Sequence, residues 1–124
     1  MSYWTTVNGT IRLKKVDGFP DFDKIVGKEC IWGSPVEFWN DLDKNPDDYM
    51  PCGSEGTLQK FITMNGGEYI VIICGNLRDF YDHDAIKSWF DGVCNKLPVK
   101  EASISMKSRD FDKRALVYKY KENK

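Results

Sequence analysis

Patterns of apolar and polar residues along the chain predict five strands. Residues 4–14 alternate apolar and polar side chains, which is the period of a half-buried strand. Similar patterns place four more strands at residues 56–64, 69–74, 99–107 and 114–120. The strand at residues 69–74 is apolar on both faces, so we expect it near the centre of the sheet. Asn65-Gly66-Gly67 predicts a tight turn between the second and third strands.

Start signals and one apolar stripe predict the helices. Asp21 is placed to cap a short helix after the first strand. Ser34, Pro35 and Glu37 have the spacing of a capping box, which predicts a second helix. A longer helix is expected over about residues 84–97. Its apolar residues lie on one side: Ile86, Trp89, Phe90, Val93 and Leu97.

This order of elements predicts a ferredoxin-like α+β fold. It is a β-α-β-β-α-β plan with one extra strand at the C-terminus. One antiparallel sheet with helices packed on one face is the simplest way to bury the apolar stripes. A more irregular α+β sheet is the alternative. Because 124 residues is close to the commonest domain size, we expect a single domain over residues 1–124.

Composition restricts the class of protein without identifying a function. Apolar residues make up 41% of the chain and charged residues 30%, as in ordinary globular proteins. No apolar run is long enough to span a bilayer, and the N-terminus lacks the features of a secretory signal. We therefore expect no membrane association and a cytoplasmic location.

The four cysteines are scattered and the chain has one histidine, a pattern that argues against a metal site. The cysteines are Cys30, Cys52, Cys74 and Cys94. Structural zinc is usually held by closely spaced pairs of ligands. We expect four free, mostly buried thiols, with no metal and no cofactor.

Charge is unevenly distributed although the net charge is only −1. Residues 16–55 carry ten acidic and three basic side chains, whereas residues 99–124 carry eight basic and four acidic ones. Such an asymmetry can steer a charged partner toward one end of a molecule. The acidic balance and the absence of an aromatic-rich RNP motif argue against nucleic acid as the partner.

Two glycine-bearing loops contain the candidate ligand-binding residues. Gly53, Ser54 and Gly56 could turn backbone N–H groups toward an anion, although the spacing is not that of a phosphate loop. Arg78 follows the central strand and could bind a carboxylate or phosphate with its planar guanidinium group. The structural alternative is an ion pair between Arg78 and Glu55 that ties the two loops together. These residues are the candidate site for a small anionic ligand.

No catalytic residue is predicted. His83 lies between Asp82 and Asp84, and an aspartate–histidine pair can perform acid–base chemistry. No nucleophile is evident, and helix capping accounts for the two acids. An enzyme that uses His83 with one of these acids is therefore the third hypothesis, after two kinds of binding protein.

Several short segments resemble small uncharacterised proteins of bacteriophages and prophages. They are residues 4–11, 51–58, 75–79 and 86–90. The resemblance implies a phage accessory protein that works in a bacterial host cell, and it makes an anti-CRISPR-like inhibitor of host defence a reasonable hypothesis. We expect a non-enzymatic protein that binds a host protein or complex, a role compatible with a homo-oligomer. The alternative is a small-molecule or nucleotide-binding protein that uses the loops at residues 53–56 and 76–79.

Overall fold

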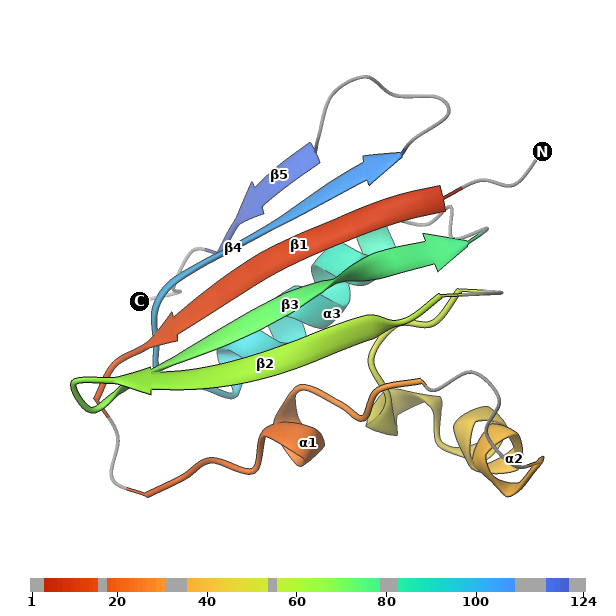
Figure 1. The fold of residues 1–124 in the computed structure, drawn as a ribbon, viewed down its shortest axis with the longest axis horizontal. Coiled ribbons are helices and arrows are strands. Elements are labelled where there is room, and N and C mark those ends of the chain that lie inside the picture. Colours follow the sequence, from red (N-terminus) through yellow and green to blue (C-terminus); the bar gives the residue numbers. More distant parts are fainter. Residues whose placement is uncertain are drawn as a thin grey trace.

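In the computed structural model the chain forms a five-stranded sheet with one long helix against it (Figure 1). The structure describes residues 4–15, 18–30, 36–53, 56–78, 83–108 and 116–120. The strands are β1 (Trp4–Leu13), β2 (Leu58–Asn65), β3 (Glu68–Arg78), β4 (Val99–Ser108) and β5 (Leu116–Lys119). The helices are α1 (Phe22–Ile25), α2 (Val36–Lys44), the 3-10 turn η1 (Pro46–Asp48) and α3 (His83–Asn95).

The strand order is β2-β3-β1-β4-β5, and all neighbouring strands are antiparallel. The extra C-terminal strand is confirmed: β5 lies at the sheet edge, where Tyr118 pairs with Ile104 of β4. The predicted tight turn is confirmed as well. Gly66 and Gly67 join β2 to β3 with φ angles of 63° and 82°, a region that glycine enters without steric cost.

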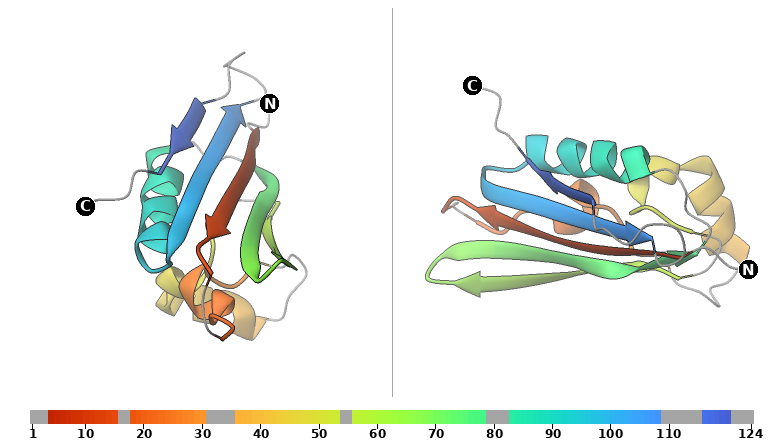
Figure 2. Two further views of the ribbon diagram at one scale, coloured as in Figure 1. Left: turned by 90° about the vertical axis from the view of Figure 1, so that its left-hand side faces the viewer. Right: turned by 90° about the horizontal axis from the view of Figure 1, so that it is seen from above.

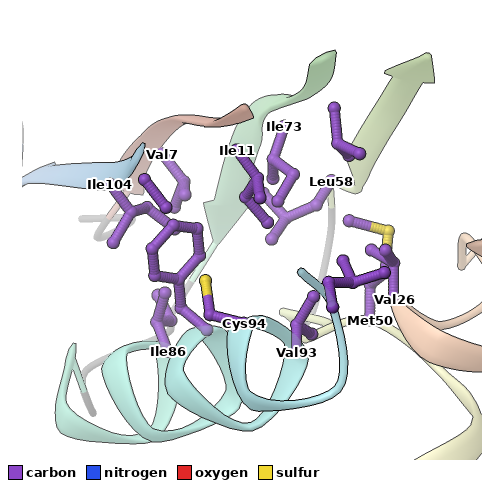
Figure 3. Packing of buried hydrophobic residues seen from close by; sticks show 14 of the residues in the cluster. Val7, Ile11, Val26, Met50, Leu58, Ile73, Ile86, Val93, Cys94 and Ile104 are labelled. Atoms are coloured by element: carbon purple, nitrogen blue, oxygen red, sulfur yellow. The ribbon is translucent and has the colours of Figure 1, made fainter. Parts of the chain in front are cut away.

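One face of the sheet and α3 share the hydrophobic core (Figure 3). Ile86 and Val93 point from α3 toward Val7 and Ile11 of β1 and Ile73 of β3. Buried residues recur at every second position of β1, which confirms the alternation expected for a strand with one buried face. No described helix covers the opposite face of the sheet (Figure 2).

The prediction of a ferredoxin-like α+β fold with helices covering one face is wrong. Strands account for nearly half of the described residues, and the helices are few and short. Of the two helices between β1 and β2, α1 has four residues, and α2 lies beyond the edge of β2 instead of over the sheet (Figure 1). Helix α3 covers part of one face, but α1 and α2 do not complete a helical layer beside it, because the segment between β1 and β2 is broken at Gly27 and again at Pro46, which leaves helices too short to span the sheet.

The segment between β1 and β2 folds locally much as its start signals predict. Asp21 caps α1 by accepting a hydrogen bond from the Lys24 backbone N–H at 3.2 Å. Helix α2 is present, whereas its predicted cap residues Ser34 and Pro35 lie outside the described residues. The chain after α1 runs parallel to the chain after η1 for a short distance, where the Met50 N–H donates to the Lys28 carbonyl at 2.9 Å.

Helix α3 confirms the predicted long helix and is the longest described helix at 13 residues. A helix needs about 20 residues to cross a bilayer. Across the described ranges, no helix is both long and apolar enough to do so.

Candidate functional site

The first predicted loop ends at Gly56, just before β2 begins, and Gly56 lies against Asn76 near the end of β3. Gly56 has a φ of 81°, and a Cβ added there would lie 2.1 Å from the Asn76 carbonyl oxygen. Only glycine tolerates both this backbone conformation and this close approach. Gly53 is half-buried nearby in the chain, whereas Ser54 and Glu55 lie outside the described residues. The proposed pairing of Glu55 with Arg78 therefore stays a prediction.

Arg78 is part of a strand and not of a loop. Strand β3 continues past the predicted end at Cys74 to Arg78, which is half-buried and opposite Trp4 of β1. Asn76 also belongs to the strand, and its side chain accepts a hydrogen bond from the Thr6 hydroxyl at 2.6 Å. The predicted loop at residues 75–79 is wrong up to Arg78 because Gly75-Asn76 is typical of a turn, although here it continues the β pairing.

His83 contacts a hydroxyl group. Its Nε2 lies 3.2 Å from Oγ1 of Thr5, and Thr5 is completely buried. Ser108 pairs with Thr5 in the sheet and is also buried, so neither hydroxyl is open to a substrate. Asp82 lies outside the described residues, and among those described no carboxylate is hydrogen-bonded to His83. This contact positions the start of α3.

A groove of about 720 Å³ runs between α3 on one side and α1, α2 and η1 on the other. This volume is in the range of small-ligand and peptide side-chain pockets. Its apolar floor includes the buried Val26, Met50 and Val93. The half-exposed ring of Trp89 lies in the wall formed by α3. The site can therefore bury apolar groups of a ligand without first rearranging its core.

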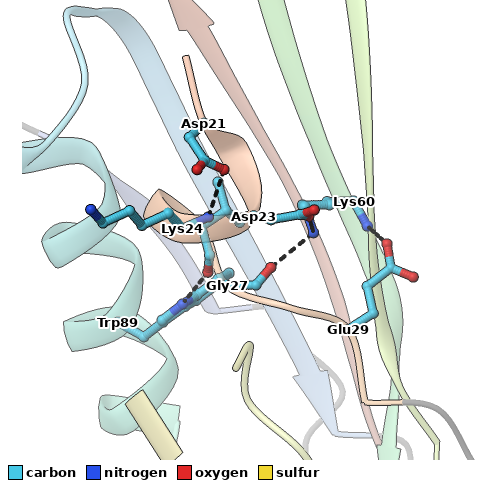
Figure 4. Close-up of polar contacts among 8 residues, drawn as sticks. Asp21, Asp23, Lys24, Gly27, Glu29, Lys60 and Trp89 are labelled. Atoms are coloured by element: carbon cyan, nitrogen blue, oxygen red, sulfur yellow. Dashed lines mark hydrogen bonds and ion pairs between the residues drawn. The ribbon is translucent and has the colours of Figure 1, made fainter. Parts of the chain in front are cut away.

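A set of buried polar contacts fixes α1 against the sheet and shapes one side of the groove (Figure 4). The Lys60 side chain is only 7% exposed, and its Nζ donates to the Gly27 carbonyl at 2.8 Å and pairs with Asp23 at 2.7 Å. The Lys60 backbone N–H donates to Glu29 at 3.2 Å, which occupies one backbone donor on the outer edge of β2. The Trp89 indole N–H donates to the Val26 carbonyl at 3.1 Å. These contacts hold the chain segment around α1, which forms one side of the groove, to both β2 and α3.

The other side of the groove is held by a contact between α2 and the chain after η1. The Tyr49 hydroxyl donates to the Asp41 carboxylate, which also accepts from the Asn45 side chain at 3.0 Å. These hydrogen bonds lower the pKa of Asp41, with the bond from Tyr49 as the main cause. The same bond to Asp41 raises the pKa of Tyr49 to about 12. The contact is therefore strongest in the pH range where Asp41 is ionised and Tyr49 keeps its proton.

Cys30 and Cys52 form a disulfide, so the prediction of four free thiols is wrong for this pair. Their Cα atoms are 6.3 Å apart, within the usual range for a disulfide. The bridge joins the chain after α1 to the chain after η1, and Cys52 lines the groove. Cys74 and Cys94 are free, and burial raises the pKa of the Cys94 thiol to about 12.

Three charged side chains line the groove without a partner among the described residues. Asp43 and Asp47 stand on the side of α2 and η1, and Lys96 stands just beyond the end of α3. All three are exposed, and none is in an ion pair with another described residue. In contrast, Lys60 is paired. The apolar floor of the groove is therefore bordered by charges that are available to a ligand.

The sequence pattern misses this site because its residues have ordinary structural explanations. Trp89 and Val93 belong to the predicted core-facing stripe of the long helix. Ala85, Gly92 and Lys96 follow at spacings that place them on the groove side of α3. The small residues Ala85 and Gly92 on the same side of the helix as Trp89 are the one feature of the sequence that indicates the groove. The opposite wall comes from residues 42–52, which no pattern connects to α3. Within the described ranges, no group of three or more potential metal ligands occurs.

Comparison with known proteins adds no further identification. No family model matches the chain, and neither a curated protein nor a solved structure matches it. Assignment of a function therefore depends on the geometry of the groove and of the two loops.

Proposed function

We propose that this chain is a non-enzymatic binding protein, and that the groove beside α3 receives a segment of a partner protein. The observation that carries the proposal is the 720 Å³ groove, with its apolar floor and with Asp43, Asp47 and Lys96 at its border, unpaired among the described residues. Partner surfaces commonly combine a desolvated apolar centre with a polar rim. The half-exposed Trp89 belongs to a residue type enriched where binding energy is concentrated.

The proposed partner is a protein or complex of a bacterial host. The resemblance of residues 51–58 and 75–79 to phage accessory proteins motivates this choice, and inhibition of host defence is the activity that it suggests. In this proposal the protein works in the cytoplasm of the host cell. A homo-oligomer is compatible with it, because the groove leaves most of the sheet free for self-association.

Filling the groove tests the proposal. A Cβ added at Gly92 meets nothing within 4 Å, so Gly92→Phe should enter the groove without disturbing the helix. Gly92→Ala is the matched control because it changes the same backbone position and leaves the groove open. Tagged wild type and both variants would be used to capture proteins from bacterial lysate. We expect one stoichiometric protein with wild type and Gly92→Ala that is lost with Gly92→Phe; equal capture by all three would refute the groove as the binding site.

A small anionic ligand at the two loops is the second candidate function. The contact of Gly56 with the Asn76 carbonyl supports it, because it brings Gly56 beside the end of β3, where Arg78 lies. Nucleotides should then raise the melting temperature of wild type and not of Arg78→Ala. A nucleotide-dependent shift that survives this substitution would exclude Arg78 from the site.

Nucleic acid is left out of the proposal. Tyr118 and Tyr120, which could have stacked on bases, instead donate hydrogen bonds to Asp91 and Asn95 of α3. Tyr118 also packs edge-on against Phe90. Their engagement with the helix supports a role in packing.

A further inference from the structure

The border charges of the groove are distributed in a way that restricts what can bind. Asp43 and Asp47 are four residues apart, on the side formed by α2 and η1, and both line the groove. Neither has a cation among the described residues. The neighbouring Asp41, in contrast, accepts hydrogen bonds from Tyr49 and Asn45. Two short carboxylates that have no cationic partner among the described residues and lie next to apolar surface favour a ligand that brings a cation.

Lys96, the third charge, does not offset these acids. It projects from the opposite side of the groove, just after α3 ends. A lysine amine sits on a flexible four-carbon stem and can turn into solvent, whereas an aspartate cannot move far from its backbone. A cationic ligand can therefore displace the Lys96 amine while it keeps contact with Asp43 and Asp47. An acidic group on the ligand could pair with Lys96 at that end.

Gly92 provides the place for a bulky apolar group. It is a half-buried helical residue between Trp89 and Val93 in the groove-facing side of α3. Because a Cβ at this position would meet open space, the groove has room for a ligand group where the glycine lies. The indole ring of Trp89 is held in place by its hydrogen bond to the Val26 carbonyl, so it forms a fixed wall beside this space.

We propose that the groove binds a short peptide segment of a partner protein that places a bulky apolar side chain over Gly92 and a lysine or arginine against Asp43 and Asp47. This inference rests on the proposed function and specifies the chemistry of its partner. The apolar side chain provides most of the affinity, and the cation provides selectivity against acidic or neutral segments.

An unbiased peptide selection tests this assignment. Short random peptides displayed on particles are selected on immobilised wild-type protein, with an excess of soluble Gly92→Phe protein to absorb peptides that bind elsewhere. Enriched peptides are then synthesised and their affinities measured for wild type and for four variants. Gly92→Phe and Ala85→Phe fill the groove at two positions, so the test does not depend on the folding of either one. Asp43→Asn/Asp47→Asn removes the charges, and Asp48→Asn is the control for a neighbouring exposed acid that does not line the groove.

We expect enriched peptides that share a bulky apolar residue and a lysine or arginine. Their affinity should fall by about tenfold or more in both groove-filling variants, as for loss of a central anchor. It should fall by about twofold to fivefold in Asp43→Asn/Asp47→Asn, the range for an exposed ion pair, and remain unchanged in Asp48→Asn. Added salt should weaken peptide binding to wild type and have a smaller effect on binding to Asp43→Asn/Asp47→Asn.

The failures are distinguishable. Groove-dependent peptides that lack a basic residue, or that bind Asp43→Asn/Asp47→Asn as well as wild type, would overturn the charge assignment and leave the groove as the binding site. If the selection enriches no groove-dependent peptide while Gly92→Phe still abolishes capture of a host protein, that result would overturn the assignment of a short peptide segment and leave the groove as the binding site. Host binding that is unaffected by Gly92→Phe and Ala85→Phe would overturn the proposed function itself.

Discussion

Lys60 is a buried cation on the side of β2 that faces α3, between Leu58 and Ile62, where strand alternation alone would place an apolar residue. Its amine joins Asp23 and the Gly27 carbonyl (Figure 4). Lys60→Met keeps the aliphatic stem and leaves that carbonyl without its donor. We expect the free energy of unfolding to fall by about 1–3 kcal/mol, the cost of an unsatisfied buried polar group, in urea denaturation.

Asp23→Asn removes the ion pair with Lys60 and leaves the hydrogen bond from Lys60 to the Gly27 carbonyl, so it measures the contribution of the ion pair alone. The Asp23 side chain is 73% exposed, so solvent screens its attraction to Lys60. We expect a change of less than about 1 kcal/mol in the same urea experiment. If Asp23→Asn were as damaging as Lys60→Met, the ion pair and not the buried carbonyl would hold α1 to the sheet.

Tyr49 gives the groove wall a dependence on pH. Its pKa is raised to about 12 in the folded protein, above the value of about 10 for an unfolded chain. A group with a raised folded pKa stabilises fully below the unfolded pKa, and this contribution is lost as the pH rises from about 10 to 12. Absorbance at alkaline pH should show tyrosines that ionise late, and Tyr49→Phe should remove one of them. Ionisation of all tyrosines near pH 10 would contradict the contact with Asp41.

The contribution of Asp41 to stability depends on pH in the opposite direction from that of Tyr49. The pKa of Asp41 is lowered in the folded protein, so its contribution is present above the unfolded value of about 4 and is lost as the pH falls through the folded value. Because the bond from Tyr49 is the main cause, Tyr49→Phe should move the pKa of Asp41 back toward its ordinary value. Carboxyl NMR titration of the two proteins measures this shift. An unchanged Asp41 titration would assign the lowering to Asn45.

At the level of elements, α3 carries a glycine in its interior at a cost in helix stability. A Cβ at Gly92 would have no neighbour within 4 Å, and the residue has no positive φ, so alanine fits without strain. Gly92→Ala should raise the free energy of unfolding by about 0.5–1 kcal/mol, the difference in helix propensity. Thermal and urea denaturation measure the change. A destabilised variant would mean that the groove closes over Gly92 in solution.

The elements themselves were largely predictable, and the errors have specific physical causes. Period-two alternation located β1, and the apolar stripe located α3 to within two residues at each end. The end of β3 was missed because Gly75-Asn76 is a common turn pair, although Leu77 continues the buried alternation. The helical layer was overestimated because capping signals show where a helix starts and not how far it extends or what it covers.

The candidate site was less predictable than the fold because its two sides are distant in sequence. Gly56 lies against Asn76 near the end of β3, a proximity that the sequence does not predict, and the role of Gly56 and Arg78 in binding a ligand stays a prediction. The groove was not identified, because Asp47 and Gly92 come together only through the three-dimensional path of the chain. Contacts between residues that are distant in sequence leave no periodic pattern in the sequence.

The disulfide is the clearest case of such proximity and gives a prediction for the whole molecule. Cys30 and Cys52 are separated by 22 positions, and closing a loop of this size should stabilise the fold by about 3 kcal/mol. Cys30→Ser, Cys52→Ser and the double variant should therefore lose the same stability, because each breaks the same bond. Unequal or additive losses would show that the two residues act separately.

Alkylation of cells lysed directly into a denaturing solution tests whether this bridge exists at the proposed location. Cytoplasmic thiols are normally kept reduced, so a protein that acts in a host cytoplasm should have Cys30 and Cys52 alkylated there and bridged only after oxidation. The protein is denatured at the moment of alkylation so that the buried Cys94 reacts as well, and mass spectrometry counts the alkylated residues. Alkylation of all four cysteines agrees with the proposed cytoplasmic location. Alkylation of Cys74 and Cys94 alone, with Cys30 and Cys52 protected, would place the working protein in an oxidising compartment and contradict the proposal of a cytoplasmic host partner.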